Sequence, residues 1–148
     1  MKGKFHARLY KEGDAAKVKV KDIFIGQGDL GGLIEARYKT NGSHIYTCLI
    51  DDDPIAVLGW SFLFPGVVDL WSIISDRVRE YPKSFYKFVM SLMEMGHENI
   101  GIYRFQMTVQ EGHQDLIRWA EALRMKCEGF MEKFGPNKEN FFIFARVY

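Results

Sequence analysis

IAVLGWSFLF at residues 55–64, followed by a PG pair and VVDLWSII at residues 67–74, is the stretch that decides the fold. Apolar residues occupy both alternating sets of positions in the first run, which is typical of a strand buried on both faces. Pro65 and Gly66 favour a turn, because proline fixes one backbone dihedral angle and glycine allows a positive one. We therefore expect 67–74 to pair back as a second buried strand, forming a central hairpin.

The spacing of the apolar residues changes after this hairpin from the period of a strand to the period of a helix. Pro82 opens a stretch whose apolar residues recur at i, i+3, i+4, i+7 and i+8, namely Phe85, Phe88, Val89, Leu92 and Met93. We predict a helix from Pro82 to about Met95, ended by Gly96 and packed on one face of the sheet through these five residues.

Shorter patterns account for the rest of the chain. Further strands are predicted at 5–10, 45–50, 103–109, 127–134 and 140–148. Further helices are predicted at 14–25, at 33–38 and from 113 onward, with turns at 39–43 and 51–54. Residues 14–25 also alternate like a strand, but we favour a helix capped by Asp14 and broken by a glycine cluster at Gly26, Gly28, Gly31 and Gly32. A helical crossover between 74 and 102 requires a parallel strand pair, so the sheet should be mixed.

Composition predicts one domain over residues 1–148 with a large core. The chain has 148 residues, is 47% hydrophobic and contains 12 Phe, 7 Tyr and 3 Trp. Its net charge of +1 gives no general attraction to a polyanion, so we expect no nucleic-acid partner. The basic residues that gather in 2–21 are more typical of a solvated face than of a binding patch.

The cysteines and the hydropathy pattern point to a cytoplasmic protein. Cys48 and Cys127 both lie in apolar stretches, which favours buried free thiols in a reducing compartment over a disulfide framework. No run approaches the roughly 20 apolar residues that a membrane-spanning helix requires, so we expect no membrane span. We also expect no metal site, because His44 and Cys48 lack zinc-site spacing and Asp51 to Asp53 lack the spacing of a calcium loop.

The order and spacing of these elements resemble the GCN5-related N-acetyltransferase (GNAT) fold over nearly the whole chain. The resemblance implies an α/β (α+β) domain with a mixed, mostly antiparallel central sheet and helices on both faces. The sequence resembles even more closely the small acetyltransferase-like proteins of short-tailed bacteriophages, some of which are internal virion proteins. The stretches that carry this closer similarity are Pro54 to Trp60, Ser75-Asp76 and Ile117-Arg118-Trp119.

The resemblance implies an acetyl-CoA site at the end of the fourth strand and the start of the following helix, where the fourth and fifth strands separate. The cofactor-binding residues that it implies are Ile73, Ile74, Ser75, Arg79, Lys83 and Ser84. Family members have an Arg or Gln, x, x, Gly, x, Gly or Ala signature there, but residues 79–85 read REYPKSF and contain no glycine. What remains is the positive end of a helix with Arg77, Arg79 and Lys83 nearby, which is either a weak anion site or a solvated helix start.

The catalytic residues that the resemblance implies are also altered. Ala120 stands where the family commonly has the Tyr that protonates the leaving thiolate, and His113 stands where an Asn opens the same helix. Asp69 is the carboxylate on the second hairpin strand that could serve as a base, or it is a polar residue that faces outward or is hydrogen-bonded. His113 is a base, a helix cap or a structural polar group.

Two functions follow from the resemblance. The first is an N-acetyltransferase that binds acetyl-CoA through a degenerate pyrophosphate loop and acetylates an unknown amine. The alternative is a catalytically inactive bacteriophage protein that uses the fold as a structural or binding module, in the virion or against a host protein. The first predicts acyl-CoA and an amine as partners, and the second predicts phage or host proteins, in the host cytoplasm or the virion.

Overall fold

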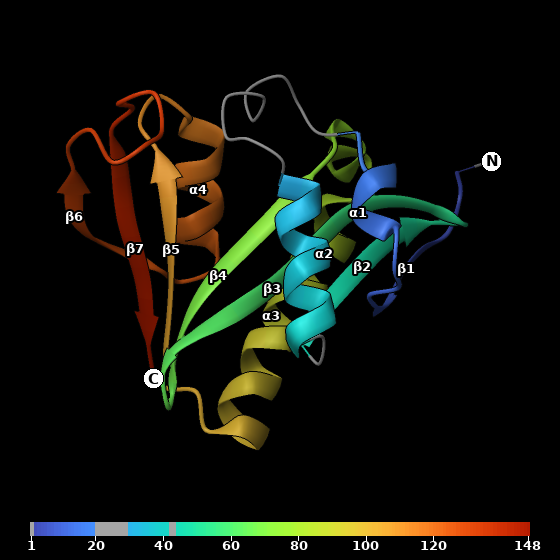
Figure 1. Ribbon diagram of the computed structural model, residues 1–148, viewed down its shortest axis with the longest axis horizontal. Helices are drawn as coiled ribbons and strands as arrows, with labels where there is room; N and C mark the ends of the chain where they lie inside the picture. Colours follow the sequence, from blue (N-terminus) through green and yellow to red (C-terminus); the bar gives the residue numbers. More distant parts are fainter. Residues whose placement is uncertain (1, 20–29, 42–43) are drawn as a thin grey trace. The chain divides into compact units, whose positions relative to one another are not determined.

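The central hairpin predicted from the sequence is present in the computed structural model, which describes residues 2–19, 30–41 and 44–148 (Figure 1). Its strands are β3 (Asp53–Phe64) and β4 (Val67–Ile74). Gly66 lies in the turn with φ of +82°, and a Cβ at this position would overlap the ring of Tyr103. Both the backbone angle and the close approach of Tyr103 therefore require glycine here.

The hairpin lies at the centre of a seven-stranded mixed sheet with the order β1-β2-β3-β4-β5-β7-β6. The other strands are β1 (Phe5–Leu9), β2 (Ile45–Ile50), β5 (Arg104–Gln110), β6 (Lys126–Met131) and β7 (Phe141–Val147). The ladders β1–β2, β2–β3, β5–β7 and β6–β7 are antiparallel, whereas β4 and β5 are parallel. The expected parallel pair across the helical crossover is confirmed.

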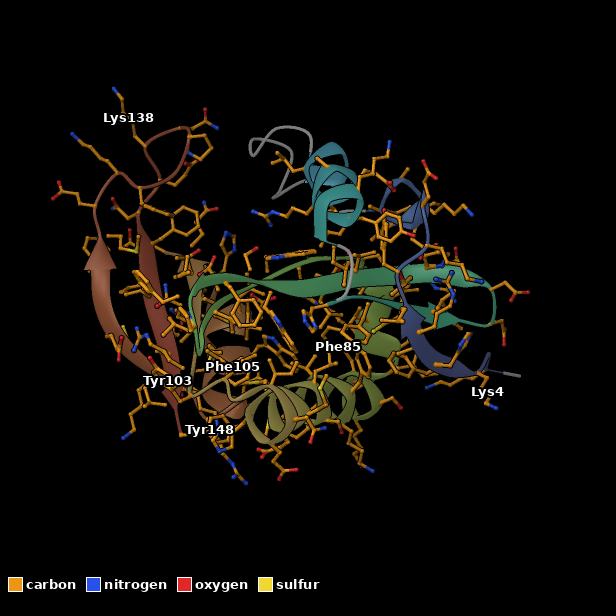
Figure 2. The ribbon with its side chains drawn as sticks, turned by 60° about the horizontal axis from the view of Figure 1, so that its bottom comes forward. Lys4, Phe85, Tyr103, Phe105, Lys138 and Tyr148 are labelled. Carbon is orange, nitrogen blue, oxygen red and sulfur yellow. The ribbon has the colours of Figure 1, made fainter. Side chains whose placement is uncertain are left out.

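The described chain forms two compact units, and the hairpin contributes to both. The first unit contains Met1–Trp60 and Trp71–Phe88. Its core is a cluster of buried residues under helices α1 (Asp14–Lys17) and α2 (Leu30–Asn41), formed by Tyr10, Ala15, Val18, Ile34, Ile45, Val57 and Ile73. Within this unit, α2 and the first half of α3 lie on opposite faces of the strands (Figure 2).

The second unit contains Ser61–Leu70 and Val89–Tyr148. Its strands β5 and β7 bury Phe105, Val109 and Phe144 on one face, and Ala120 and Leu123 are buried in the region of α4 (Gln114–Ala122). The closing hairpin of β6 and β7 is confirmed. Tyr148 packs its ring against Phe105, with ring centroids 5.9 Å apart (Figure 2).

The predicted helix after the hairpin is confirmed as α3 (Pro82–Met95). Phe85, Val89, Leu92 and Met93 are buried as expected, while Phe88 is half-buried with its ring edge against Tyr46. The α-helix ends at Met95, but a π-helical turn, Gly96–Ile100, follows it. Gly101, with φ of +81°, ends that turn in the left-handed conformation. A 3-10 helix, η3 (Asp76–Glu80), lies between β4 and α3.

Several expectations for strands and thiols were wrong. The hairpin strand β3 is buried only from Pro54 to Trp60, and the end of it exposes Phe62, Leu63 and Phe64. These three side chains lie beyond the part of β3 that pairs with β2, whose register ends at Gly59. Cys127 is exposed on the edge strand β6, whereas Cys48 is fully buried.

The helices before β2 also differ from prediction. The helix expected at 14–25 ends at Lys17, because Val18 is extended, and residues 20–29 with Gly26 and Gly28 lie outside the described residues. Gly31 and Gly32 do not break a helix but lie within α2, which also includes residues 39–41 that were expected to form a turn. Tertiary packing of Ile34 and Tyr38 into the first core outweighs the low helix propensity of glycine.

Candidate functional site

The parallel ladder between β4 and β5 is short. It joins Val67 to Arg104, Val68 to Phe105 and Asp69 to Gln106, and ends there. Strand β4 nevertheless continues to Ile74, and β5 continues to Gln110. Beyond Asp69, the backbone groups of β4 that would face a parallel partner are therefore outside this ladder, which agrees with the separation that the GNAT resemblance implied.

The end of β4 is fixed by contacts within the first unit. Ile73 is 2% exposed and belongs to the core cluster with Val57, whereas Ile74 is half-buried. The backbone N–H of Ser75 donates to the carbonyl of Ile55 at 2.9 Å. The Oγ of Ser75 accepts from the backbone N–H of Arg77 at 3.2 Å, so this buried serine caps η3. Ser75 therefore positions the start of η3: its N–H is bonded to Ile55, and its Oγ already accepts one hydrogen bond.

The backbone amides of η3 are also used within the fold. The N–H of Val78 donates to the carbonyl of Ser75 at 3.2 Å, and the N–H of Tyr81 donates to the carbonyl of Val78 at 3.0 Å. Together with the N–H of Arg77, which donates to Ser75 Oγ, these amides are not free to bind an anion. In this chain they stabilise a 3-10 helix instead.

The cations near this segment are balanced by carboxylates. Arg77 forms ion pairs with Asp53 and, at 3.1 Å, with Glu80, and these contacts raise the pKa of its guanidinium. Arg79 lies 3.8 Å from the carboxylate of Asp76. These groups are about half exposed or more, so each pair contributes little to stability. Their main effect is to leave the segment without excess positive charge.

The first turn of α3 offers a smaller anion site. Pro82 has no N–H, and the N–H of Phe85 donates to the carbonyl of Tyr81 at 3.0 Å. Lys83 and Ser84 are exposed at the positive end of this 14-residue helix. Among the described residues, the ammonium of Lys83 has no carboxylate partner within ion-pair distance.

These observations decide how the residues fit acetyl-CoA. The end of β4 beyond its ladder with β5 suits an extended pantetheine arm, which bonds to backbone groups as an added strand does. The segment from Asp76 to Pro82 suits a pyrophosphate poorly, because the amides of Arg77, Val78 and Tyr81 are bonded within the fold and both arginines are paired with carboxylates. The described residues therefore fit the pantetheine arm of acetyl-CoA well and its pyrophosphate poorly.

The catalytic candidates Asp69 and His113 both belong to the second unit. Asp69 is half-buried and ends the β4–β5 ladder opposite Gln106. His113 precedes α4 and caps it through its backbone, because its carbonyl accepts from Leu116 and Ile117 at 3.1 Å while its side chain makes no capping hydrogen bond. The imidazole of His113 is half-buried.

Ala120, at the position of the expected tyrosine, is fully buried in α4. A methyl group packed in the core supplies neither a proton nor a hydrogen bond. A proton for a leaving thiolate therefore has to come from a different group than residue 120.

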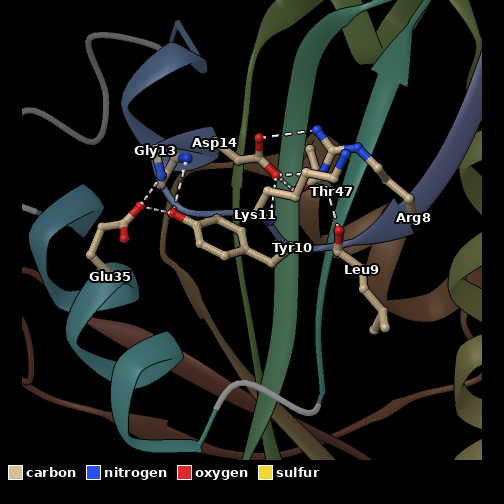
Figure 3. A network of polar contacts seen from close by, with 9 residues as sticks. Arg8, Leu9, Tyr10, Lys11, Gly13, Asp14, Glu35 and Thr47 are labelled. Carbon is tan, nitrogen blue, oxygen red and sulfur yellow. Dashed lines mark hydrogen bonds and ion pairs between the residues drawn. The ribbon is translucent and has the colours of Figure 1, made fainter.

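A polar network in the first unit was not recognised from the sequence (Figure 3). Asp14 is 2% exposed and accepts from Arg8 at 2.7 and 3.1 Å, from Thr47 Oγ1 at 2.6 Å and from the N–H of Lys11 at 2.8 Å. Burial alone would raise the pKa of Asp14, but these hydrogen bonds outweigh it and hold the pKa below its ordinary value. Asp14 thus anchors α1 to β1 and β2 rather than capping a helix, because Gly13 holds the N-cap position.

The same network holds α2. The hydroxyl of Tyr10 donates to the carboxylate of Glu35, which also accepts from the N–H of Gly13 at 2.6 Å (Figure 3). The Tyr10 hydroxyl in turn accepts from the N–H of Ala15 at 3.2 Å. Burial, and then the hydrogen bond to Glu35, raise the pKa of Tyr10. These contacts join residues up to 33 positions apart, so no local sequence pattern predicts them.

A second cluster that the sequence did not reveal surrounds Tyr148 in the second unit. The ring of His97 stacks on the ring of Tyr148 with centroids 4.0 Å apart, and the Arg146 guanidinium lies 4.3 Å from the same ring. Glu94 accepts from Arg146 at 2.9 Å and from the Tyr148 hydroxyl at 3.0 Å. Burial, and then Glu94, raise the pKa of Tyr148 to about 12. The cluster fastens the end of β7 to α3 and the π-helical turn.

Neither metal ligation nor membrane insertion finds support in the described residues. Over 2–19, 30–41 and 44–148, no three His, Cys, Asp or Glu side chains gather in a way that could hold a metal ion. In the same ranges, no helix has the length and apolar character needed to cross a bilayer.

Comparison with known proteins connects this geometry to one fold. The sequence matches no protein-family model and no curated protein sequence. Among solved structures, the chain is similar to Ard1 from Thermoplasma volcanium, with a TM-score of 0.81 and 10% identity over 97% of both chains. It is also similar to a GNAT-family acetyltransferase from Bacillus anthracis, with a TM-score of 0.73 and 12% identity over 99% of this chain and 98% of that chain.

A third similar structure contains coenzyme A. RimL, a ribosomal L7/L12 alpha-N-protein acetyltransferase in complex with coenzyme A, gives a TM-score of 0.74 and 13% identity over 97% of this chain and 93% of that chain. At such identities a structural likeness establishes the fold alone. The chain therefore has the GNAT fold, with a mixed, mostly antiparallel sheet and helices on both faces.

Proposed function

We propose that this chain binds an acetyl thioester through its pantetheine arm along the end of β4 and transfers the acetyl group to an amine. The observation that carries the proposal is the parallel β4–β5 ladder, which ends at Asp69 and Gln106 while both strands continue. The GNAT fold supports it, since the similar RimL structure is a complex with coenzyme A.

Within this proposal, Ile73, Ile74 and Ser75 form the strand end against which the arm lies. Ser75 acts by fixing η3, since its Oγ and N–H are bonded within the fold. Lys83 and Ser84 take the phosphate nearest the arm at the start of α3, and Arg79 lies on the preceding η3 with its charge balanced by Asp76. The acetyl thioester supplies the electrophilic carbonyl when bound.

Acetyl transfer also requires that the amine lose a proton and that the leaving thiolate gain one. We assign these tasks to the side chains of Asp69 and His113, both of which are half-buried and therefore reachable by water. Asp69 is the proposed base, because it lies where the β4–β5 ladder ends. His113, or a water molecule held by it, is the proposed acid.

Calorimetric titration with acetyl-CoA and with free CoA tests the binding step, and thiol release in the presence of simple amines and peptides tests the transfer. We expect heat of binding from both ligands and thiol release that depends on the amine. Absence of any heat up to millimolar ligand would contradict the proposal.

A second candidate function is a catalytically inactive bacteriophage protein that uses the fold as a binding module in the virion or against a host protein. Two observations favour it: buried Ala120 cannot donate a proton, and the amides of η3 are bonded within the fold. Binding of acetyl-CoA without thiol release on any amine would support this alternative. For either function, we propose that the protein acts in the cytoplasm. If it is a bacteriophage protein, this is the cytoplasm of the host cell.

A further inference from the structure

We infer that the side-chain amide of Gln106 donates a hydrogen bond to the carbonyl oxygen of the acyl thioester, and that Arg104 and Glu128 hold this amide in position. The inference rests on the proposed function and adds a catalytic residue to it. Gln106 lies on β5 and, with Asp69, forms the last pair of the parallel β4–β5 ladder. All four residues belong to the second unit.

Strand β5 has one polar and one apolar face. Arg104, Gln106 and Thr108 alternate along it with the buried residues Phe105 and Val109. Since successive side chains of a strand point to opposite faces, Arg104 and Gln106 lie together on the face opposite to Phe105. Both are half-buried rather than fully exposed. A few fixed polar groups in half-buried positions are typical of ligand-binding sites.

The orientation of the Gln106 amide follows from its contact with Arg104. The Nε–H of Arg104 donates to Gln106 Oε1 at 3.0 Å. An arginine side chain has no acceptor, so the amide must turn its oxygen to Arg104 and its NH2 group elsewhere. Among the described residues, Nε2 of Gln106 makes no hydrogen bond, and it is not one of the polar atoms that are sealed from solvent. Its two hydrogens therefore remain available to a ligand.

Arg104 is itself held by Glu128 on β6, two strands away. The two terminal nitrogens of Arg104 donate to the two carboxylate oxygens of Glu128 at 3.0 and 2.5 Å. A bidentate contact of this kind fixes the plane of the guanidinium as well as its position. The Nε–H that holds Gln106 is part of the same plane, so Glu128 fixes the direction of the Gln106 amide through Arg104.

Two features of the strands make this contact possible. Strand β7 lies between β5 and β6, and its residue opposite Gln106 is Ala145. The small side chain of Ala145 leaves room for Arg104 to reach across β7. The register of β6 against β7 shifts at Glu128, which is therefore the extra residue of a β-bulge. Bulges redirect a side chain and are common next to active sites.

The available NH2 group lies where the proposed function places the reaction. The arm runs along β4 beyond Asp69 with its phosphate toward α3, so its thioester lies at the opposite end, where the ladder ends. Gln106 is the β5 residue of that last ladder pair. Neighbouring strands are about 5 Å apart, a distance that a glutamine side chain can span. Gln106 can therefore reach a carbonyl group held at this position.

The chemical role follows from the charge that develops during transfer. The amine nitrogen attacks the carbonyl carbon, a C–N bond forms, and the π electron pair moves to the carbonyl oxygen. An N–H donor that is already fixed toward this oxygen stabilises the charge without reorganisation. The electron pair then returns, the C–S bond breaks, and the thiolate leaves with the bonding pair. The amine proton goes to Asp69, and the thiolate takes a proton from His113 or its water.

Thiol release by two variants tests the role of the donor. Gln106→Glu keeps an oxygen for Arg104 but replaces the NH2 group, and Gln106→Met removes the donor without adding charge. We expect kcat to fall by about 10² to 10³ in both variants, the usual cost of losing one such donor. KM should change little, because the interaction is made mainly in the transition state. Gln106→Glu should melt at the same temperature as the native protein.

Two results would contradict the role of the donor. An unchanged kcat in Gln106→Met would show that the reaction does not use the amide. A fall in Gln106→Glu alone would be an effect of the added charge and would also overturn the inference.

A matched pair of variants tests the positioning of the amide. Glu128→Gln removes the charge that fixes Arg104, so kcat should fall, by less than in Gln106→Met, with KM unchanged. Glu94→Gln is the control, because Glu94 accepts from Arg146 at 2.9 Å on the opposite face of the same sheet, and kcat should not change. Equal kcat values in the two variants would overturn the positioning by Glu128.

The same assay separates the inference from the proposed function. If the native protein releases no thiol with any amine, the proposed function fails and the inference fails with it. If the native protein releases thiol and both Gln106 variants are equally active, the inference alone fails.

Discussion

Two helix starts in the first unit, those of α1 and α3, both bring an arginine to a carboxylate, but with opposite exposure. At α1 the carboxylate of Asp14 is 3% exposed and accepts from Arg8, Thr47 and a backbone amide (Figure 3). At the segment before α3, Arg77 is 45% exposed and its partners Asp53 and Glu80 are 57% and 51% exposed. The same pairing of residue types therefore has two different consequences.

The buried pair holds the fold, because breaking it leaves charged groups away from water. The exposed pairs hardly affect stability but set the field that an anionic ligand meets. From the sequence alone, the basic residues near the start of α1 and those near the start of α3 look alike. Their burial and their partners distinguish them: the buried pair at α1 stabilises the fold, and the exposed pairs before α3 affect which ligand binds.

The largest effect should come from breaking the buried pair. Asp14→Ala leaves Arg8, Thr47 and an amide without their acceptor, so we expect a loss of about 3 to 5 kcal/mol in the free energy of unfolding. Urea denaturation measures it. Asp53→Ala, which breaks an exposed pair, is the control and should cost under about 1 kcal/mol. Similar losses in the two variants would remove the contrast between the helix starts.

The start of α4 extends the comparison to a residue whose side chain makes no capping hydrogen bond. His113 caps α4 through its carbonyl alone, so His113→Ala should leave the melting temperature nearly unchanged. If His113 is the acid, turnover should fall by about 10² to 10⁴, the usual contribution of a positioned acid or base. Unchanged turnover, or a large loss of stability, would exclude this role.

The lowered pKa of Asp14 should also make the buried pair sensitive to acid. The pKa of Asp14 is lowered from its ordinary value of 3.8 in the folded state. Its contribution to stability is therefore complete above pH 3.8 and is lost as the pH falls through the lower folded value. Between these values Asp14 should steepen the fall in unfolding free energy by at most about 1.4 kcal/mol per pH unit. Urea melts from pH 5 to 2 should show this extra slope in the native protein and not in Asp14→Asn.

The smallest effect concerns the exposed pairs. Asp53→Asn combined with Glu80→Gln frees Arg77 without removing its hydrogen-bonding neighbours, so affinity for acetyl-CoA should rise by about twofold to fivefold. Glu98→Gln, an exposed neutralisation in the second unit, serves as the control and should leave the affinity unchanged. Equal changes in both variants would indicate a general charge effect rather than a local one.

Elements with a clear hydrophobic period could be predicted from the sequence. The hairpin of β3 and β4, the helix α3 and the closing hairpin follow from alternation and from spacing of three to four residues. The GNAT fold was predicted through a resemblance, and the structural likeness confirms it. Where prediction failed, long-range packing decided the result, as for Gly31 and Gly32 inside α2 and for the exposed end of β3 at Phe62 to Phe64.

The candidate site was predictable in outline but not in its details. The absence of glycine in 79–85 showed that a phosphate loop was altered. That Ser75 caps η3, and that Arg77 pairs with Asp53 across 24 residues, depends on tertiary structure that no local pattern carries. The roles assigned to Asp69, His113 and the residues from Ile73 to Ser84 stay predictions.

The central claim is that an acyl-pantetheine arm lies along the end of β4, and hydrogen–deuterium exchange with and without acetyl-CoA tests it most directly. A bound arm that bonds to the strand should slow exchange at the backbone amides of residues 70–75, and the phosphate should slow exchange at Lys83 and Ser84. Protection confined to these two stretches is the result that we predict. Unchanged exchange at residues 70–75 under saturating ligand, or protection only elsewhere, would contradict it.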